Sequence, residues 1–245
     1  MGGDDGWNFR GKGLIQLTGR DNYSKANVFT KKYENVDILA NSDLVAHDLK
    51  IAVLSTMAFF VFRNINIIAP KTRDVEGPLI VFDKSGVLFK TYSLCRGSNA
   101  NRLKAGGNGD TPIGKASTRY DANAHKGEYS YGNYGLIYLE GLTSEFLTAT
   151  KNGRAGIAIH SGHTTGYFKK SLKDLGKLMG TYGCVRVYNK EMEKLGKLYT
   201  KLKEQGRKIY CYIEDYDGNI KDVYAHYKMD LDSKDSSRGK RSTIQ

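Results

Sequence analysis

The stretch MGTYGCVRVYNKEMEKLGKLYTKLKEQG, residues 179–206, holds a glycine turn, a short apolar run and a long helical pattern. After residue 189, apolar side chains recur every three or four positions, which predicts an amphipathic helix with one buried face. That face contains Met192, Leu195, Leu198, Tyr199 and Leu202. We expect Asn189 to cap the start of the helix and Gly206 to cap its end.

The segments around this helix have the pattern of β-strands. PLIVFD (78–83), KSG (84–86) and VLFKTYSLC (87–95) predict a strand, a glycine turn and a second strand. YGLIYLEG (134–141) and AGIAIH (155–160) are two more β-type runs, whereas residues 96–134 read as long loops. KIYCYIED (208–215), YDGN and IKDVYAHY (220–227) predict a final hairpin. Because the strands lie too close together for βαβ units, we expect an α+β fold: a mostly β sandwich or barrel with one main helix.

The first 70 residues differ in character and read as loop and helix. SDLVAHDLKIAVLSTMAFFVF (42–62) starts with a capping-type Ser42 or Asp43 and continues with the spacing of a buried helix. Its apolar positions include Leu44, Leu49, Val53 and Met57. We therefore divide the chain into a helical part at 1–72, a β-rich part at 73–227 and a polar, flexible tail at 228–245.

Composition narrows the class of partner. The formal net charge is +12 over 245 residues, which favours an anionic partner such as nucleic acid, an acidic membrane surface or a bacterial cell wall. No apolar run approaches the about 20 residues that span a bilayer. The glycine-rich, acidic N-terminus lacks the pattern of a signal peptide. The three cysteines are far apart, so we expect neither a complete disulfide framework nor a CxxC-type metal site.

The three cysteines need different interpretations. Cys211 alternates with isoleucines and Cys95 ends a strand, so both are expected in the core. Cys184 instead follows a turn-prone glycine, and Arg186 lies on the same side of an extended chain. A nearby guanidinium lowers the pKa of a thiol, and the thiolate is the nucleophile. His160, at a strand end beside a glycine loop, is well placed as a base. Residue types and spacing alone leave packing and chemistry equally open for this pair.

These segments resemble the catalytic core of bacterial L,D-transpeptidases. IAIHSG (157–162), then GTYGCVRVYN (180–189) and a helix, is similar to the family's strand ending in His and its Ser/Thr-x-Gly-Cys-x-Arg/Asn signature. GGNGDTPIGKAS (106–117) resembles the family's Thr-Pro-x-Gly segment, which also follows a hairpin. The resemblance covers about residues 78–215. It implies an enzyme that acts on peptidoglycan stem peptides through an acyl-enzyme, without metal or cofactor.

The resemblance implies a role for each matching residue. Cys184 is the expected nucleophile, His160 the general base, and Gly183 part of the turn that exposes the sulfur. N–H groups around Gly183 and Cys184 are expected to form the oxyanion hole. Ser161 and Thr181 are expected to orient the pair, and Arg186 to hold a substrate carboxylate or to stiffen the loop.

Two departures from the family pattern stand out. Tyr182, expected near the substrate, stands where the family often has His. Twenty residues separate His160 from Thr181, somewhat more than the family usually places there. The insert includes FKKSLKDLGK (168–177), which we expect to form a short basic helix or a lid. The extra length leaves His163 as a rival base, whereas His47, His125 and His226 are expected to be structural.

The N-terminal stretch WNFRGKGLIQLTGRDNYSKA (7–26) resembles family 19 chitinases and related phage endolysins. NSDLVAHDLKIAVLSTMAFF (41–60) continues the match, which implies a small, helical, lysozyme-like fragment over about residues 1–70. Glycoside hydrolysis needs two placed carboxyl groups or a carboxyl and a positioned water. The catalytic glutamates of that family precede the matched segment, so we expect a truncated remnant. It is expected to bind glycan through Gln16, Asn22 and Tyr23, or only to pack on the second domain.

The sequence therefore favours a peptidoglycan-modifying cysteine enzyme, an L,D-transpeptidase or L,D-carboxypeptidase. We expect it to act in the periplasm, the cell wall or outside the cell, by a route other than an N-terminal signal peptide. Two wall-type modules in one chain also suggest a delivered antibacterial toxin or a phage-derived lysin. The alternatives are a non-catalytic wall-binding protein and a chitinase- or endolysin-type glycosidase. Nucleic acid is not an expected partner, because no recognition motif accompanies the basic helix.

Overall fold

The computed structural model describes residues 5–14, 16–61, 65–83, 86–164 and 174–229. The chain forms two compact units, one of residues 1–64 with 82–86 and one of residues 65–81 with 87–245. The prediction of loop and helix up to residue 70 is wrong at its end, because Ile65–Pro70 forms strand β1 of the larger unit. Ile65, Ile67 and Ala69 of this strand are buried, which gives it the character of a core strand.

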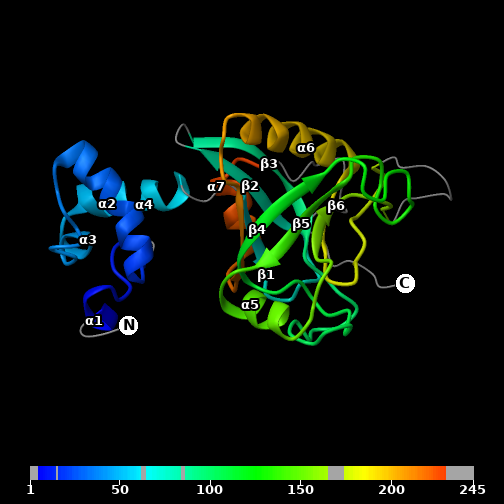
Figure 1. Ribbon diagram of the computed structural model, residues 1–245, viewed down its shortest axis with the longest axis horizontal. Helices are drawn as coiled ribbons and strands as arrows, with labels where there is room; N and C mark the ends of the chain where they lie inside the picture. The colour runs from blue at the N-terminus through cyan, green and yellow to red at the C-terminus, as the bar shows by residue number, and fades with distance from the viewer. Residues whose placement is uncertain (1–4, 15, 62–64, 84–85, 165–173, 230–245) are drawn as a thin grey trace. The chain divides into compact units, whose positions relative to one another are not determined.

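The larger unit is a closed barrel in the order β1-β2-β3-β7-β6-β5-β4-β8, with β8 pairing in parallel with β1 (Figure 1). This confirms the expected α+β class, with a mostly β barrel. Besides β1, its strands are β2 (Gly77–Asp83), β3 (Gly86–Leu94), β4 (Gly114–Asp121), β5 (Leu136–Gly141), β6 (Ala158–His160), β7 (Val185–Val187) and β8 (Tyr210–Tyr216). Cys95 and Cys211 are buried in its core, as predicted.

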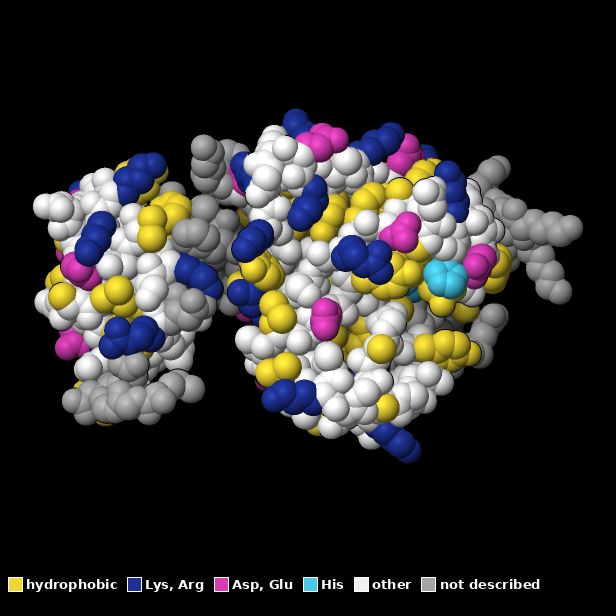
Figure 2. All heavy atoms as spheres, viewed as in Figure 1, with side chains coloured by type: hydrophobic (Ala, Val, Ile, Leu, Met, Phe, Trp, Pro, Cys, Tyr) yellow, Lys and Arg dark blue, Asp and Glu magenta, His cyan; other side chains and the backbone are white. Residues whose placement is uncertain are grey.

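Helix α6 (Asn189–Glu204) confirms the predicted amphipathic helix. Met192, Leu195, Tyr199 and Leu202 lie in the same apolar cluster as the barrel strands, and Leu198 packs against it. Lysines and glutamates cover the outer face of α6 and form ion pairs such as Lys197–Glu193 at 2.6 Å (Figure 2). Gly206, with φ +74, takes the left-handed conformation that ends the helix.

The cap of α6 corrects one prediction. Tyr188 occupies the N-cap position and makes no side-chain cap. The carboxylate of Asp174 instead accepts hydrogen bonds from the Asn189 N–H at 2.7 Å, the Asn189 Nδ2 at 3.0 Å and the Lys190 N–H at 3.0 Å. The start of α6 is therefore capped by a residue from the preceding insert. Residues 165–173 of that insert, and with them most of the predicted basic helix or lid, lie outside the described residues.

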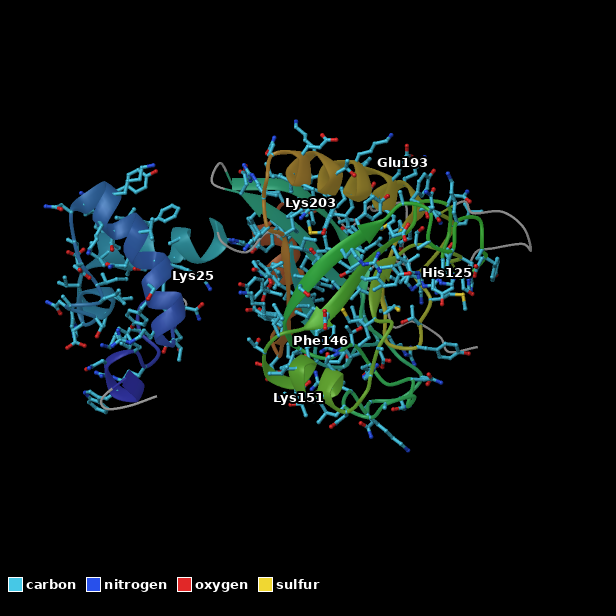
Figure 3. The ribbon with its side chains drawn as sticks, viewed as in Figure 1. Lys25, His125, Phe146, Lys151, Glu193 and Lys203 are labelled. Carbon is cyan, nitrogen blue, oxygen red and sulfur yellow. The ribbon has the colours of Figure 1, made fainter. Side chains whose placement is uncertain are left out.

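Three elements of the barrel unit differ from the prediction. Strand β4 lies inside the segment 96–134 that reads as loops; it is polar, and only Ala116 is fully buried. Residues 220–227 do not complete a hairpin, because Asn219 caps helix α7 (Ile220–His226) by accepting from the Lys221 N–H. Helix α5 (Ser144–Lys151) was not predicted; it directs Phe146 into the core and Lys151 to solvent (Figure 3).

The smaller unit is helical: α1 (Asp5–Asn8), α2 (Arg20–Glu34), α3 (Leu44–His47) and α4 (Leu49–Val61). The single helix expected over 42–62 is broken at Asp48, whose Oδ1 accepts the N–H groups of Lys50 and Ile51. The break turns Leu49 and Val53 outward, so both are exposed while Ile51 is buried. In the described ranges, no helix combines the length and apolarity needed to cross a membrane.

Candidate active site

The site is organised by the parallel pairing of β6 and β7. Ile159 lies opposite Val185, and His160 lies opposite Arg186. Ile159 and Val185 are fully buried in the core. Because side chains alternate along a strand, His160 and Arg186 project from the other face. Cys184, two residues before Arg186, lies on their side of the sheet.

A cavity of about 360 Å³ opens on this face. It brings together most of the predicted site residues: Cys184, His160, His163, Thr181, Tyr182 and Arg186. Ser130 and Tyr131 also line it and come from the connection between β4 and β5, which carries His125 (Figure 3). The ring of His125 stacks on Tyr131, with ring centroids 4.3 Å apart. His125 therefore supports a wall of the cavity, as a structural histidine would.

His160 is buried and held in one tautomer. Its Nδ1 lies 2.7 Å from the carbonyl oxygen of Ser161. A carbonyl only accepts, so Nδ1 carries the proton and Nε2 keeps a free lone pair. Burial, and next the Arg186 guanidinium, lower the pKa of His160 to about 3. The imidazole is therefore neutral at pH 7 and can accept a proton through Nε2.

His163 is held differently. Its ring stacks on Tyr129 with centroids 3.9 Å apart, and its backbone N–H donates to the Tyr129 carbonyl. Its own carbonyl accepts from Arg186 Nη1 at 3.2 Å. Burial and Arg186 lower the pKa of His163, and its buried Nδ1 has no hydrogen-bond partner among the described residues. The rival histidine thus lies in the same cavity, but no carbonyl of the described residues bonds its Nδ1 and fixes its tautomer.

Cys184 is partly exposed, and its Sγ donates to the carbonyl of Gly156 at 3.6 Å. Burial raises the pKa of this thiol, and the Ala158 N–H, Arg186 and Arg154 oppose that rise. The expected influence of Arg186 is present, but burial outweighs it. The two shifts favour a neutral thiol beside a neutral imidazole.

The turn before Cys184 has a defined geometry. Gly183 has φ +111, a conformation that favours glycine. Thr181 Oγ1 accepts from the Gly183 N–H at 3.1 Å and donates to the Cys184 carbonyl at 2.8 Å. Thr111, of the Thr-Pro-Ile-Gly segment, lies 3.3 Å from the same carbonyl through its Oγ1. The Gly183 N–H, one of the donors expected for the oxyanion hole, is therefore occupied by Thr181.

Ser161 supports the site without lining the cavity. It is fully buried, and its Oγ donates to the Tyr131 carbonyl at 3.2 Å. The next residue, Gly162, is bonded through its carbonyl to Asn189 Nδ2 at 2.8 Å. Asn189 is in turn bonded to Asp174. The loop after His160 is thus tied to the cavity wall and to the start of α6.

The three predicted glycan contacts lie in the other unit and not in this cavity. Gln16 is exposed, and Asn22 is half-buried and donates to the Thr18 carbonyl at 2.8 Å. Tyr23 is fully buried, packs on Phe9 and donates to the Arg10 carbonyl. The Tyr23 side chain is therefore not available to a ligand on the surface. Within the described ranges, no group of three His, Cys, Asp or Glu side chains could hold a metal ion.

The structure adds residues that sequence reasoning missed. Arg154, between α5 and β6, is buried behind the Cys184 turn, and Asp174 caps α6. The sequence NGRAG, a lone arginine among small residues just before the His160 strand, was the available signal for Arg154. The available signal for Asp174 was weaker, since an acidic residue in a lysine-rich insert also fits a solvated surface.

Comparison with known proteins defines the class. A family model of the L,D-transpeptidase catalytic domain (YkuD) matches residues 75–206. The chain therefore belongs to the L,D-transpeptidase catalytic domain family. This membership confirms the resemblance read from the Cys184 and His160 segments.

A second similarity is to a glycosyl hydrolase. A glycosyl hydrolase family 19 domain-containing protein of Haemophilus influenzae is 33% identical over 91 residues, 37% of this chain and 44% of that protein. The chain thus spans less than half the length of that relative. This match confirms the resemblance of a segment to family 19.

Two solved structures are similar to this chain, at 14% identity each. The L,D-transpeptidase of Xylanimonas cellulosilytica has a TM-score of 0.34, with 67% of this chain and 69% of that chain covered. An Ldtfm–avibactam carbamoyl enzyme has a TM-score of 0.32, with 64% of this chain and 50% of that chain covered.

Proposed function

We propose that this protein is a cysteine acyltransferase that cleaves peptidoglycan stem peptides through an acyl-enzyme on Cys184. The observation that carries the proposal is the shared cavity of Cys184, His160 and Arg186, in a chain that belongs to the L,D-transpeptidase family. The substrate bond is the one between the third, diamino acid residue and the terminal D-alanine. The remaining choice, between an amine acceptor (transpeptidase) and water (carboxypeptidase), depends on what enters the cavity next.

The proposed reaction has two halves, formation of a thioester on Cys184 and its transfer to an acceptor. His160 Nε2 takes the proton of the Cys184 thiol, and Sγ attacks the substrate carbonyl. The N–H of Cys184 stabilises the oxyanion. The C–N bond breaks, the proton passes from His160 to the leaving D-alanine amine, and a thioester remains. An acceptor amine or water then attacks the thioester, the C–S bond breaks, and the proton of the acceptor passes through His160 to the sulfur, which restores the thiol.

His160 is favoured over His163 as the base on two grounds. Its Nδ1 is occupied by the Ser161 carbonyl, so the proton-accepting nitrogen is defined. Its strand register also places it on the same face as Cys184 and Arg186. His163 is proposed to shape the cavity through its Tyr129 stack and its carbonyl bond to Arg186.

Arg186 is proposed to hold a substrate carboxylate. It is 3% exposed and lines the cavity. One terminal nitrogen, Nη1, donates to His163, while Nε has no hydrogen-bond partner among the described residues. A buried donor without a partner is costly, and a stem-peptide carboxylate would supply that partner. Tyr182, 76% exposed at the rim, is proposed to contact the rest of the peptide.

The test is to incubate the full chain with purified muropeptides and follow the products by mass spectrometry. Loss of the terminal D-alanine, or a cross-linked product, is expected for the wild type and not for Cys184→Ala. His160→Gln should abolish turnover, whereas His163→Gln should retain it at a reduced rate. Intact tetrapeptides, or equal turnover by Cys184→Ala, would contradict the proposal.

The family 19-like unit is proposed to retain the enzyme on the wall through glycan contacts that include Gln16 and Asn22. A Gln16→Ala/Asn22→Ala variant should bind insoluble peptidoglycan less tightly in a pull-down, with unchanged turnover of soluble muropeptides.

The pairing of the two modules also fits a delivered antibacterial toxin. Expression directed to the bacterial periplasm should then arrest growth, whereas expression of Cys184→Ala in the same way should not.

A further inference from the structure

A second guanidinium lies behind the turn that carries Cys184. Arg154, in the connection from α5 to β6, is 6% exposed. Its two terminal nitrogens donate to the carbonyls of Arg102 and Gly109, in the loop that precedes the Thr-Pro-Ile-Gly segment. Unlike Arg186, it does not line the cavity. A substrate in the cavity would therefore be bound by Arg186 and not by Arg154.

Arg154 packs directly against the backbone of Gly183. A Cβ built on Gly183 would overlap Arg154 Nη2 and would lie 2.8 Å from the Gly109 carbonyl oxygen. The positive φ of Gly183 is thus one reason for glycine at this position, and the approach of Arg154 is another. The Arg154 guanidinium therefore fixes the position of the residue that precedes the nucleophile.

The charge of Arg154 is not neutralised by an ion pair with any described residue. Among the described residues, no carboxylate forms a salt bridge with it; Asp110 and the Cys184 thiolate act on it at longer range. Burial lowers the pKa of Arg154, and a Cys184 thiolate raises it. The attraction is mutual, because Arg154 also opposes the rise in the pKa of Cys184.

We propose that Arg154 is a positioning residue for the nucleophile: it fixes the Gly183–Cys184 turn, and its positive charge stabilises the Cys184 thiolate. This role rests on the proposed function, in which the thiolate forms when His160 accepts the thiol proton. The effect on the thiol itself can be measured without any substrate. It can therefore be tested separately from peptidoglycan turnover.

The experiment measures the rate at which iodoacetamide alkylates Cys184 in the full chain, from pH 7 to pH 10.5. The Cys184→Ala variant gives the background from the buried Cys95 and Cys211. In Arg154→Gln the rate at a fixed pH below the thiol pKa should fall about tenfold, because removing a neighbouring charge shifts a pKa by about one unit or more. Arg154→Lys keeps the charge but loses the two-pronged hydrogen bonding, and it should stay within about threefold of the wild type.

The matched control is Arg119→Gln, an exposed arginine on the outer face of β4 that stacks on Tyr138, and it should leave the rate unchanged. An unchanged or faster rate in Arg154→Gln, or equal losses in Arg154→Gln and Arg154→Lys, would overturn the charge role. If Arg154→Gln does not fold, a shift of a full unit in Arg154→Lys alone would also overturn it. The proposed function fails separately, if Cys184→Ala still converts muropeptides.

Discussion

Replacing Asp174 by alanine should weaken both the fold and the active site. The carboxylate of Asp174 accepts three hydrogen bonds at the start of α6, two from Asn189 and one from Lys190. Asn189 is also the residue that holds Gly162, two positions after His160. The substitution therefore removes a helix cap and releases the side chain that fixes the loop after the proposed base.

The loss in stability can be worked from these contacts. A lost N-cap costs about 1 kcal/mol, and a lost negative charge at a helix N-terminus costs about 0.3–1 kcal/mol. The sum, about 1–2 kcal/mol, should lower the melting temperature by about 2–8 °C for a chain of this size. A displacement of His160 of about 1 Å should in addition reduce turnover on the order of a hundredfold.

The matched control is Asn219→Ala. Asn219 caps α7 by accepting from the Lys221 N–H at 3.2 Å, and α7 supplies no residue to the cavity. Both variants lose a cap, so both melting temperatures should fall. That of Asp174→Ala should fall more, because this variant also loses a negative charge at the helix N-terminus. Muropeptide turnover below both melting temperatures should fall only in Asp174→Ala. Equal turnover in the two variants would refute the idea that the link through Asn189 to Gly162 positions His160.

Three further predictions concern the turn and its histidine. Because the fold holds the pKa of His160 at about 3 against an ordinary 6.5, only the unfolded chain binds this proton between those values. The free energy of unfolding should therefore fall as the pH falls below 6.5, by up to about 1.4 kcal/mol per pH unit. Urea unfolding at pH 7 and pH 5 should show a smaller fall in His160→Gln than in the wild type. Because burial raises the pKa of Cys184, its alkylation rate should keep rising beyond pH 9, and a plateau near pH 7 would instead reveal a thiolate at rest. Gly183→Ala must force a side chain into φ +111 and against Arg154, so its melting temperature should fall by the equivalent of about 1–3 kcal/mol or more; combining it with Arg154→Ala should recover only the steric part.

The elements that were predicted correctly are those whose pattern is local. The face of α6 and the alternation of Cys211 in β8 follow from burial of one side of a regular element, which the residue order records directly. Strand β4 was not predicted because its sequence is mostly polar. Its place is set by pairing with the next strand, β5, and with β8, which lies far along the chain. Helix α7 was not predicted, because the turn at residues 216–219 can lead into a strand or into a helix. The side-chain cap from Asn219 favours the helix.

The same distinction between local pattern and distant contacts applies to the residues of the site. Residue types and spacing alone leave Cys184 and His160 open between packing and chemistry. The resemblance to the L,D-transpeptidase motif singles out these two residues and Arg186, and the pairing of β6 with β7 brings them to one face. Arg154 and Asp174 could not be predicted, because most of their partners are main-chain groups. Arg154 contacts the carbonyls of residues 52 and 45 positions away. A backbone carbonyl is present at every position, so no residue type signals which one an arginine will meet.

Arg186 and Arg154 do not act on the Cys184–His160 pair in the same way. Arg186 lies opposite His160 in the sheet, and it lowers the pKa of the imidazole as well as that of the thiol. What it contributes to forming the thiolate is therefore offset by what it costs to form the imidazolium beside it. A substrate carboxylate bound to Arg186 would neutralise that charge and make His160 a stronger base. Arg154 packs behind Gly183 and acts on the thiol. In a site where burial disfavours both charged forms, the arginine outside the cavity can support the thiolate before and after the substrate binds.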